Sequence, residues 1–280
     1  MVQETAILDR YGVIGYPISQ SKSPVIHQQF AEQTGEQLIY ELIEAHPDNL
    51  EKVVKQFQRA GGKGLNVTVP HKSRVTRLVD ELSEAASIAG AVNTLKLDND
   101  RVVGFNTDGI GLVRDLRDNW KCEIPDTRIL ILGAGGATQG ILGPLLDLEP
   151  ESIVIANRTV VKADALANHF GALGNVEGMR FGDVKSVEPF DLVINATSAD
   201  LSGETPPFPH QAIKRGHTAC YDLSYALHKT PFITWAEQAD AGRTRAGWGM
   251  LIEQAAESFR IWRGIQPETK PVLQRLPAAN

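Results

Sequence analysis

Short apolar runs alternate with segments of helical periodicity along the first hundred residues. Predicted strands lie at 11–15, 38–43, 65–69, 91–97 and 101–105. Predicted helices lie at 24–33 and 48–60, the first with Pro24 in its opening turn and the second ended by Gly61 and Gly62. The last two strands form a predicted hairpin around Asp98, Asn99 and Asp100. This alternation predicts a sheet covered by helices.

The pattern changes near residue 107, where a second series of elements begins. Helices are predicted at 110–116, 137–148, 160–170 and 249–262, and strands at 128–132, 152–156, 191–195 and 217–221. These strands are continuous apolar runs, which is typical of parallel strands buried on both faces of a doubly wound sheet. We therefore predict an α/β protein of two domains, the first with a mixed sheet and the second Rossmann-like.

Composition narrows the class of protein. The formal net charge of −6 argues against a nucleic-acid partner, which needs a basic face. Cys122 and Cys220 lie far apart, so we expect free thiols in a reducing compartment. The histidines are not spaced as metal ligands. No segment reaches the ~18 apolar residues of a membrane span, and the N-terminus has no apolar signal core. We expect a soluble cytoplasmic protein without a metal.

A glycine-rich turn follows the apolar strand 128–132 and opens the next predicted helix. It consists of Gly133, Ala134, Gly135, Gly136 and Ala137. Glycines here allow a tight turn and let backbone amides approach a pyrophosphate at the helix N-terminus. The spacing departs from the usual dinucleotide motif, because Thr138 stands where a third glycine is expected. The alternative is an ordinary strand–helix connection without a ligand.

The end of the next strand, 152–156, indicates which dinucleotide would bind. Asn157, Arg158 and Thr159 follow it, with Lys162 one turn later and no carboxylate before Asp164. A guanidinium suits the 2′-phosphate of NADP, whereas NAD-binding folds usually carry an acidic residue there. The alternative is a solvated Arg and Lys at the start of a surface helix.

Polar clusters also lie at the ends of the strands of the first part, where open α/β sheets gather ligands. They contain Ser21 and Ser23, then Asn66, Thr68 and Lys72, then Asn93, and finally Asp108. The serine hydroxyls could bind an anion, although a helix cap explains one of them equally well. Lys72, predicted at a helix start, opposes the helix dipole, although lone lysines are usually surface residues. Reduction of a ketone by hydride needs a proton donor, and a lysine oriented by a carboxylate serves that purpose.

Together these clusters closely resemble the shikimate dehydrogenase family. The matching stretches, in order, are VIGYPISQSKSPVIH (13–27), GLNVTVPHK (64–72), AGAVNTL (89–95), GFNTDGIG (104–111), GAGGA (133–137), NRT (157–159), INATS (194–198), YDLSY (221–225) and GWGMLIEQAA (247–256). The resemblance implies a substrate-binding domain over 1–107, completed by helices within 247–280. It implies an NADP-binding domain over 108–246.

The resemblance also implies roles for individual residues. Ser21 and Ser23, assisted by Tyr225, would hold the carboxylate of shikimate. The ring hydroxyls would be bound by Asn66, Thr68, Asn93, Asp108 and Gln254. Lys72 would be the catalytic acid and base, with Asp108 beside it. The glycine turn would cradle the pyrophosphate, and Asn157, Arg158, Thr159 and Lys162 would face the 2′-phosphate. Glu84, Leu223 and Gly247 would line the cofactor cleft.

Three residues depart from what is frequent in the family: Gln20, Tyr16 and Trp248. None of them removes a catalytic group. We therefore expect NADP-dependent reduction of 3-dehydroshikimate to shikimate, by a monomer or homodimer without a nucleic-acid or membrane partner. One alternative is a broader quinate/shikimate dehydrogenase that also uses NAD. Another is a catalytically silent sensor, which the joint presence of Lys72 and Asp108 disfavours.

Overall fold

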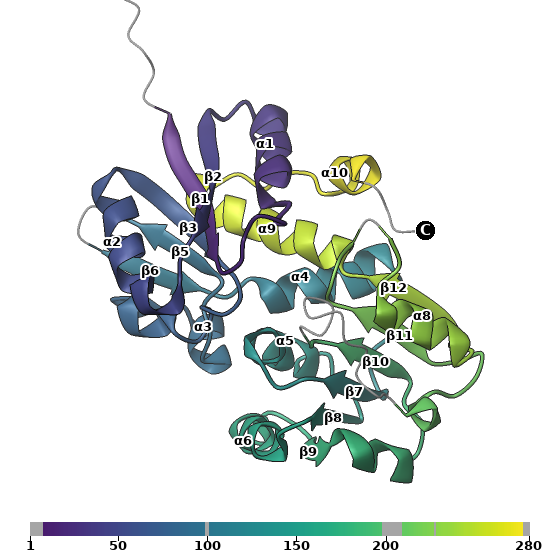
Figure 1. Cartoon of the computed structure of the whole chain (residues 1–280). Coiled ribbons are helices and arrows are strands. Elements are labelled where there is room, and N and C mark those ends of the chain that lie inside the picture. The colour runs from purple at the N-terminus through teal and green to yellow at the C-terminus, as the bar shows by residue number, and fades with distance from the viewer. Residues whose placement is uncertain (1–7, 99–100, 198–208, 227, 277–280) are drawn as a thin grey trace, which may run out of the picture. The chain divides into compact units, whose positions relative to one another are not determined.

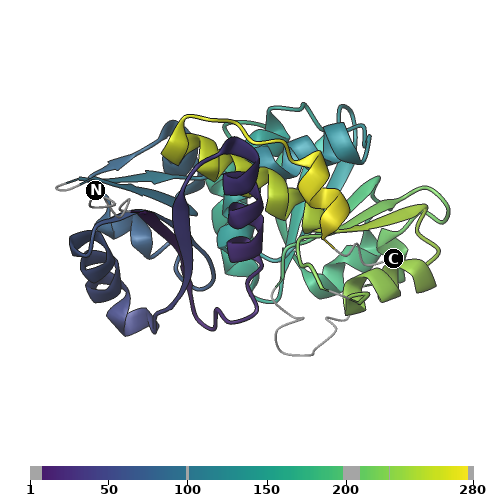
Figure 2. The ribbon, with the colours of Figure 1, turned by 90° about the horizontal axis from the view of Figure 1, so that it is seen from above.

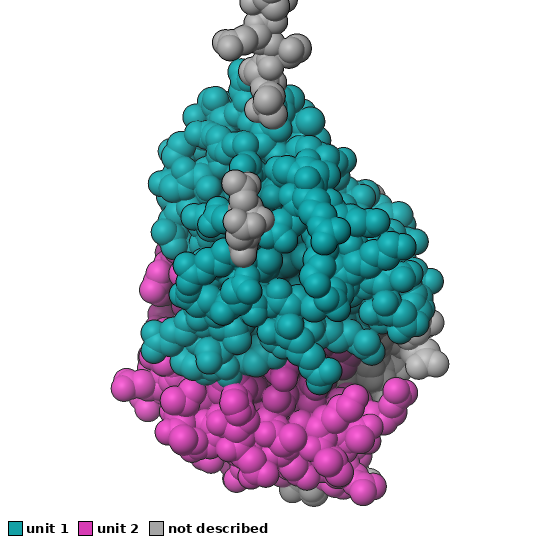
Figure 3. Space-filling model, turned by 90° about the vertical axis from the view of Figure 1, so that its left-hand side faces the viewer, with its two compact units in different colours: residues 1–107, 252–272 teal, residues 108–251, 273–280 magenta. Residues whose placement is uncertain are grey.

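The computed structural model describes residues 8–98, 101–197, 209–226 and 228–276. The chain divides into two compact units, coloured separately in Figure 3. Unit 1 comprises Met1–Thr107 and Ile252–Val272, and unit 2 comprises Asp108–Leu251 and Leu273–Asn280. The chain therefore returns to unit 1 at Ile252, later than the predicted 247. The reason is that Met250, in the first turn of the last long helix, packs into the core of unit 2.

Unit 1 contains a mixed six-stranded sheet in the order β2-β1-β3-β5-β6-β4 (Figure 1). Its strands are β1 Asp9–Gly15, β2 Leu38–Glu44, β3 Gly62–Val67, β4 Glu81–Leu82, β5 Thr94–Leu97 and β6 Val102–Phe105. β1 runs parallel to β2 and β3, whereas β5 is antiparallel to both β3 and β6. The predicted mixed sheet is confirmed. The turn residues Asn99 and Asp100 of the predicted hairpin lie outside the described residues.

The helices of unit 1 bury their apolar sides against this sheet and against each other. They are α1 Ser23–Thr34, α2 Leu50–Arg59, α3 Glu84–Ala89 and the part of α9 (Trp248–Arg263) that begins at Ile252. α1 and α9 lie side by side, as Figure 2 shows, through Phe30 and Phe259. The predicted helix 48–60 is divided, because a 3₁₀ turn over Pro47–Asn49 precedes α2.

β3 starts and ends earlier than its apolar residues suggest. The sequence predicts 65–69, and the strand spans Gly62–Val67. A Cβ at Gly64 would lie 2.3 Å from Nε1 of Trp262, and one at Gly62 would lie 2.2 Å from the ring of Phe57. Glycine in this strand therefore marks close approach of other groups to its backbone.

Unit 2 contains a six-stranded parallel sheet in the order β12-β11-β10-β7-β8-β9. The strands are β7 Arg128–Leu132, β8 Ser152–Asn157, β9 Val176–Arg180, β10 Leu192–Asn195, β11 Ala219–Asp222 and β12 Arg243–Ala246. The chain starts in the middle at β7, winds outward to β9, and then returns to β10 on the other side. This is the doubly wound order of a Rossmann-like fold, as predicted, with its switch point between β7 and β10.

Alternate residues of these strands feed two hydrophobic cores, one on each face of the sheet. Ile129 and Ile131 belong to the core with α4 (Asp108–Arg114), α5 (Gly136–Leu146) and α6 (Val160–Phe170). Leu130 and Leu132 belong to the core with α8 (Pro231–Gln238). Both faces are covered, which explains why the strand reads as a continuous apolar run.

Several elements differ from the prediction or have no counterpart in it. The predicted helix 110–116 is divided into α4 and a π-helical turn over Asp115–Asn119. The short helices α8 and α10 (Lys270–Arg275) and the edge strands β9 and β12 have no counterpart among the predicted elements. β9 reads VEGMR and β12 reads RTRA, so neither shows the continuous apolar run of the inner strands.

Candidate active site

Ser21 and Ser23 lie where β1 leads into α1. The hydroxyl of Ser21 accepts a hydrogen bond from the backbone N–H of Ser23 at 3.3 Å and donates one to Ser23 Oγ at 3.2 Å. The residue in the N-cap position of α1 is Lys22. Neither serine is therefore the helix cap, and the two hydroxyls lie together at the start of the helix.

A buried polar network forms around Asn93, directly before β5. Asn93 Oδ1 accepts the backbone N–H of Thr107 at 2.8 Å. Asn93 Nδ2 donates to Thr107 Oγ1 at 2.9 Å and to Gln254 Oε1 at 3.2 Å. Gln254 is carried by α9, so the network joins two distant parts of the chain within unit 1. Two of the predicted amides, Asn93 and Gln254, are thus brought into direct contact.

Asn66, the penultimate residue of β3, extends the same network. Its Oδ1 accepts from the hydroxyl of Tyr40 at 2.7 Å and lies 3.2 Å from His27 Nε2. Its Nδ2 donates to Ser258 Oγ at 2.9 Å. Sequence reasoning missed His27, Tyr40 and Ser258. The one available signal was that Ser258 stands one helical turn after Gln254, on the same side of the helix.

His27 is fully buried and stacks on the ring of Tyr40, with 4.3 Å between ring centroids. Burial lowers the pKa of His27 from 6.5 to about 3, against the hydrogen bond to Asn66, which raises it. The ring is therefore neutral, and its Nδ1 has no hydrogen-bond partner among the described residues. A neutral ring with hydrogen on Nε2 donates to Asn66 and leaves Nδ1 as an acceptor.

We expect this histidine to make the protein less stable in acid. Between pH 6.5 and 3 the unfolded chain binds one more proton than the folded one, so the free energy of unfolding falls as the pH falls. The loss at pH 5 relative to pH 7 is about 2 kcal/mol. Urea unfolding at pH 5 and pH 7 measures this loss in the free energy of unfolding. In His27→Gln the difference between the two pH values should be smaller by about the same amount. The same substitution at exposed His217 is the control. If His27→Gln loses as much free energy of unfolding between pH 7 and pH 5 as the wild type does, the expectation is wrong.

Thr68 and Lys72 follow β3 in a series of turns. The backbone N–H of Thr68 donates to Ile14 O at 3.0 Å, and the carbonyl oxygen of Lys72 accepts from Val92 N at 2.8 Å. Between them, buried His71 places Nε2 at 2.8 Å from Ala45 O. The backbone of half-buried Lys72 is thereby tied to the residue before Asn93.

Lys72 does not start a helix, contrary to the sequence prediction. It stands in a turn, and the next regular structure along the chain is the 3₁₀ turn Val75–Leu78. Its position therefore owes nothing to a helix dipole. Asp108, its predicted partner, is buried and is the first residue of α4. It belongs to unit 2 but directly follows Thr107, which is held by Asn93 in unit 1.

The glycine turn of unit 2 has the backbone that its sequence predicts. Gly133 has a φ of 103°, and a Cβ there would lie 3.0 Å from Ala196 O. Gly135 is exposed, and among the described residues no atom lies within 4 Å of where its Cβ would stand. Thr138, at the position of the missing glycine, is buried and donates to Gly133 O at 2.8 Å. The unusual spacing therefore adds a bond that closes the turn.

The basic group at the end of β8 lies next to this turn. β7 and β8 are paired, and the N–H of Gly133 donates to Ala156 O at 2.8 Å. Asn157 Nδ2 donates to Thr159 O at 2.9 Å, which fixes the bend between β8 and α6. Arg158 and Lys162 are exposed.

A second loop of unit 2 carries Leu223 and Tyr225 after β11. Gly247 donates its N–H to Ser224 O at 3.0 Å, and a Cβ on Gly247 would lie 2.5 Å from Leu223 O. Glycine is therefore required for this contact. Trp248 Nε1 donates to Ala226 O at 3.2 Å, and its ring lies 5.1 Å from that of Tyr225. Trp248 thus holds the loop that carries Tyr225.

Gln20 and Tyr16, the other two residues that are infrequent in the family, precede α1. Gln20 Nε2 donates to Pro17 O at 3.3 Å, and the ring of Tyr16 meets His46 edge-on at 5.2 Å.

Two further predicted residues remain to be placed. Glu84, predicted to line the cofactor cleft, is exposed and is the first residue of α3 in unit 1. Ser198, at the end of the INATS stretch, lies outside the described residues.

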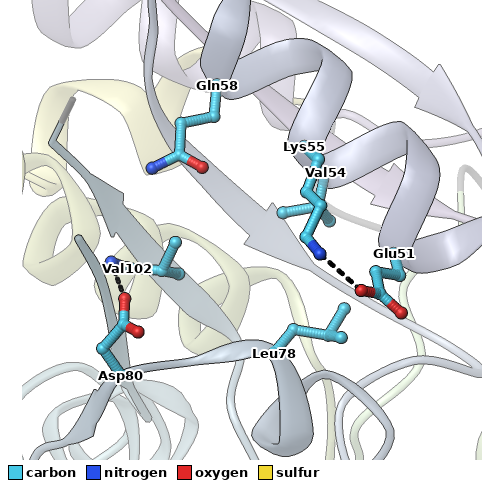
Figure 4. Close-up of a pocket in the computed structure, with 7 residues that line it drawn as sticks. All are labelled: Glu51, Val54, Lys55, Gln58, Leu78, Asp80 and Val102. Carbon is cyan, nitrogen blue, oxygen red and sulfur yellow. Dashed lines mark hydrogen bonds and ion pairs between the residues drawn. The ribbon is translucent and has the colours of Figure 1, made fainter. Parts of the chain in front are cut away.

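A separate pocket of about 180 Å³ lies between α2 and the β4–β6 edge of unit 1 (Figure 4). Its lining residues are Glu51, Val54, Lys55, Gln58, Leu78, Asp80 and Val102. Lys55 pairs with Glu51 at 2.6 Å, and Asp80 Oδ2 accepts from Val102 N at 2.7 Å. The lining contains none of the predicted site residues.

Other chemistry is sparse in the described part of the chain. Cys122 and Cys220 are free and buried, and burial raises the pKa of both thiols, that of Cys220 to about 12. Among the described residues, no three His, Cys, Asp or Glu side chains are grouped to hold a metal ion. No described helix is both long enough and apolar enough to pass through a membrane.

Three family profiles match this chain. They are the shikimate dehydrogenase substrate-binding domain over residues 13–95, the shikimate/quinate 5-dehydrogenase domain over 116–215, and the shikimate 5′-dehydrogenase C-terminal domain over 247–276. The shikimate dehydrogenase (NADP(+)) of Methylococcus capsulatus is 52% identical over 271 residues, which is 96% of each chain.

Solved structures agree with this assignment. An Ael1 enzyme from Pseudomonas putida has a TM-score of 0.87 at 43% identity, covering 96% of this chain and 98% of that one. Shikimate 5-dehydrogenase from Thermus thermophilus, solved with NADP(H) and shikimate, has a TM-score of 0.83 at 30% identity, covering 95% of this chain and 98% of that one. With such identity over nearly its whole length, the chain belongs to the shikimate dehydrogenase family.

Proposed function

We propose that this chain catalyses the reversible, NADP-dependent reduction of 3-dehydroshikimate to shikimate. The observation that carries the proposal is the 52% identity to an NADP-dependent shikimate dehydrogenase over 96% of the chain. The chain is thus an oxidoreductase of the shikimate pathway. No feature of its site, in the part of the chain that the structure describes, favours the broader quinate enzyme or the silent sensor.

Unit 1 supplies most of the substrate-binding groups in this proposal, and Asp108 and Tyr225 come from unit 2. Ser21 and Ser23, with Tyr225 from unit 2, bind the carboxylate of shikimate. The ring hydroxyls are bound by Asn66, Thr68, Asn93, Asp108 and Gln254. The hydrogen bonds from Asn66 to the backbone oxygen of Asn93 and from Asn93 to Gln254 support this assignment, because preset amides lose little freedom when a polyol binds.

Unit 2 supplies the cofactor-binding groups. The exposed, open backbone at Gly135 and the start of α5 leave room for a pyrophosphate, so the turn Gly133–Ala137 fits a dinucleotide. Asn157, Arg158, Thr159 and Lys162 face the 2′-phosphate. Leu223 and Gly247, together with Glu84 from unit 1, complete the proposed set of cofactor-binding residues.

Proton transfer falls to Lys72. When bound, NADPH supplies a hydride to the ketone carbon of the substrate. Lys72 donates a proton to the carbonyl oxygen, so that the ketone becomes a secondary alcohol, and then regains a proton from solvent. Asp108 orients the ammonium. In the reverse direction Lys72 accepts the hydroxyl proton.

The buried free thiols support a cytoplasmic enzyme, and the acidic net charge supports the absence of a nucleic-acid partner. We propose that the enzyme acts as a monomer or homodimer.

The test is the initial rate of cofactor reduction with shikimate or quinate, each with NADP or NAD. We expect a high rate only with shikimate and NADP. Comparable rates with quinate or NAD would establish the broader enzyme instead. No turnover with any pair, while ligands still bind, would establish a silent sensor.

A further inference from the structure

We propose that Ser258 is a positioning residue for the substrate, because its hydroxyl joins the Asn66 amide to the group formed by Asn93, Thr107 and Gln254. The proposal rests on the proposed function, since it takes Asn66, Asn93 and Gln254 as the amides that bind the ring hydroxyls. Ser258 itself touches no substrate in this account and acts through its neighbours.

The hydroxyl of Ser258 stands at the centre of the network. It is fully buried on α9, and its Oγ donates to Gln254 O at 3.0 Å. It also lies 2.7 Å from Thr94 Oγ1 and 3.3 Å from Thr107 Oγ1. A serine hydroxyl can donate one hydrogen bond and accept two. All of its capacity is therefore used inside the network.

The direction of the Asn93 amide is set by a backbone group. The N–H of Thr107 can only donate, so the atom it contacts at 2.8 Å is the oxygen of Asn93. Asn93 Nδ2 therefore faces Gln254, and its hydrogen bond is accepted by the side-chain oxygen Oε1 of Gln254. This leaves the NH₂ group of Gln254 at the other end of its amide, as the donor end.

The direction of the Asn66 amide is set from both sides. Its oxygen receives the hydroxyl of Tyr40 and faces His27. Its nitrogen donates to Ser258 Oγ at 2.9 Å, whereas its other acceptors are farther away, Thr94 Oγ1 at 3.2 Å and Asn93 O at 3.4 Å. Ser258 is thus the nearest acceptor for this nitrogen, and it ties β3 to α9.

The hydroxyl of Ser258 ties β3 to α9, and it does so through groups of the predicted substrate site. Alanine would keep the helix and fill nearly the same space, and burying a hydroxyl costs free energy unless it is bonded. Each bond of Ser258 leads to Asn66 or to a residue in contact with Asn93 or Gln254. The cost of burying it is therefore offset by bonds to the predicted substrate-binding amides.

We expect Ser258→Ala to raise the shikimate KM roughly ten-fold, the effect of one oriented hydrogen bond. Because the misaligned amides contact the substrate in the ground state and the transition state alike, kcat should change less than about two-fold. The NADP KM should also stay within about two-fold. Thr218→Val, which removes a buried hydroxyl bonded to Phe190 O in unit 2, is the control for lost stability and should leave the shikimate KM unchanged.

Two further variants keep the test decisive. Ser258→Cys keeps the volume but bonds weakly, so it should also raise the shikimate KM, even if the alanine variant does not fold. In an Asn66→Ala background, Ser258→Ala should add little, because the two act as a unit. Unchanged KM in the folded Ser258 variants, or fully additive effects, would overturn the positioning role.

The wild-type protein is assayed first with shikimate and NADP. If the wild-type protein forms no NADPH, the proposed function is wrong, and this result does not depend on the variants. If the wild type is active and Ser258→Ala has an unchanged shikimate KM, the function stands and only the role of Ser258 is lost.

Discussion

Lys72→Ala should lower kcat about 10²- to 10⁴-fold, the usual contribution of a positioned general acid. The shikimate KM should stay within a few-fold, because the amides and serines that bind the substrate in our proposal are untouched. The backbone of Lys72 is bonded to Val92, the neighbour of Asn93, so its side chain starts beside the substrate-binding network. The measurement is steady-state oxidation of shikimate under saturating NADP.

Two control variants separate proton transfer from charge. Lys72→Arg keeps the positive charge but holds its protons too tightly to donate one, so it should be nearly as slow as the alanine variant. Lys63→Ala, which removes an exposed lysine from β3 in the same unit, should leave kcat unchanged. Full activity in Lys72→Ala, or full rescue by arginine, would refute the acid–base role.

Arg158→Ala should raise the NADP KM roughly 10- to 100-fold, the effect of losing a hydrogen bond between charged groups. The NAD KM should hardly change, because NAD lacks the 2′-phosphate. Arg158 is exposed at the end of β8, beside the glycine turn, and its side chain can therefore meet a phosphate without disturbing the core. The ratio of the two KM values is therefore the diagnostic quantity.

An arginine elsewhere on unit 2 provides the matched control. Arg215 is also exposed but precedes β11, at the amino ends of the strands, where parallel sheets do not bind ligands. Arg215→Ala should leave both KM values unchanged. Equal rises for NADP and NAD in Arg158→Ala would mean that Arg158 does not recognise the phosphate.

Local patterns sufficed for most of unit 2. Strands β7 and β8 were predicted within a residue, because burial on both faces leaves a continuous apolar run. The glycine turn was recognisable because Gly133 needs a positive φ that other residues rarely adopt. Both signals lie within a few consecutive residues.

The two edge strands of the unit 2 sheet were not predictable in this way. β9 and β12 are polar strands held by one neighbour each, and their pairing supplies the order that their own residues do not indicate. In β3, glycine stands at positions 62 and 64 because Phe57 and Trp262 occupy the space where side chains would stand. Such strands depend on contacts with residues far away in the chain.

The candidate site likewise has features that the sequence predicts and features that depend on tertiary contacts. The order and identity of Ser21, Asn66, Lys72 and Asn93 are readable along the chain, since each lies at or near the end of a strand, where open α/β sheets bind ligands. The contact between Asn66 and Ser258 spans 192 residues, and the neutral state of His27 results from burial by its neighbours. A sequence records which groups are available. Their partners, their direction and their protonation depend on packing between distant segments, which only the tertiary structure decides.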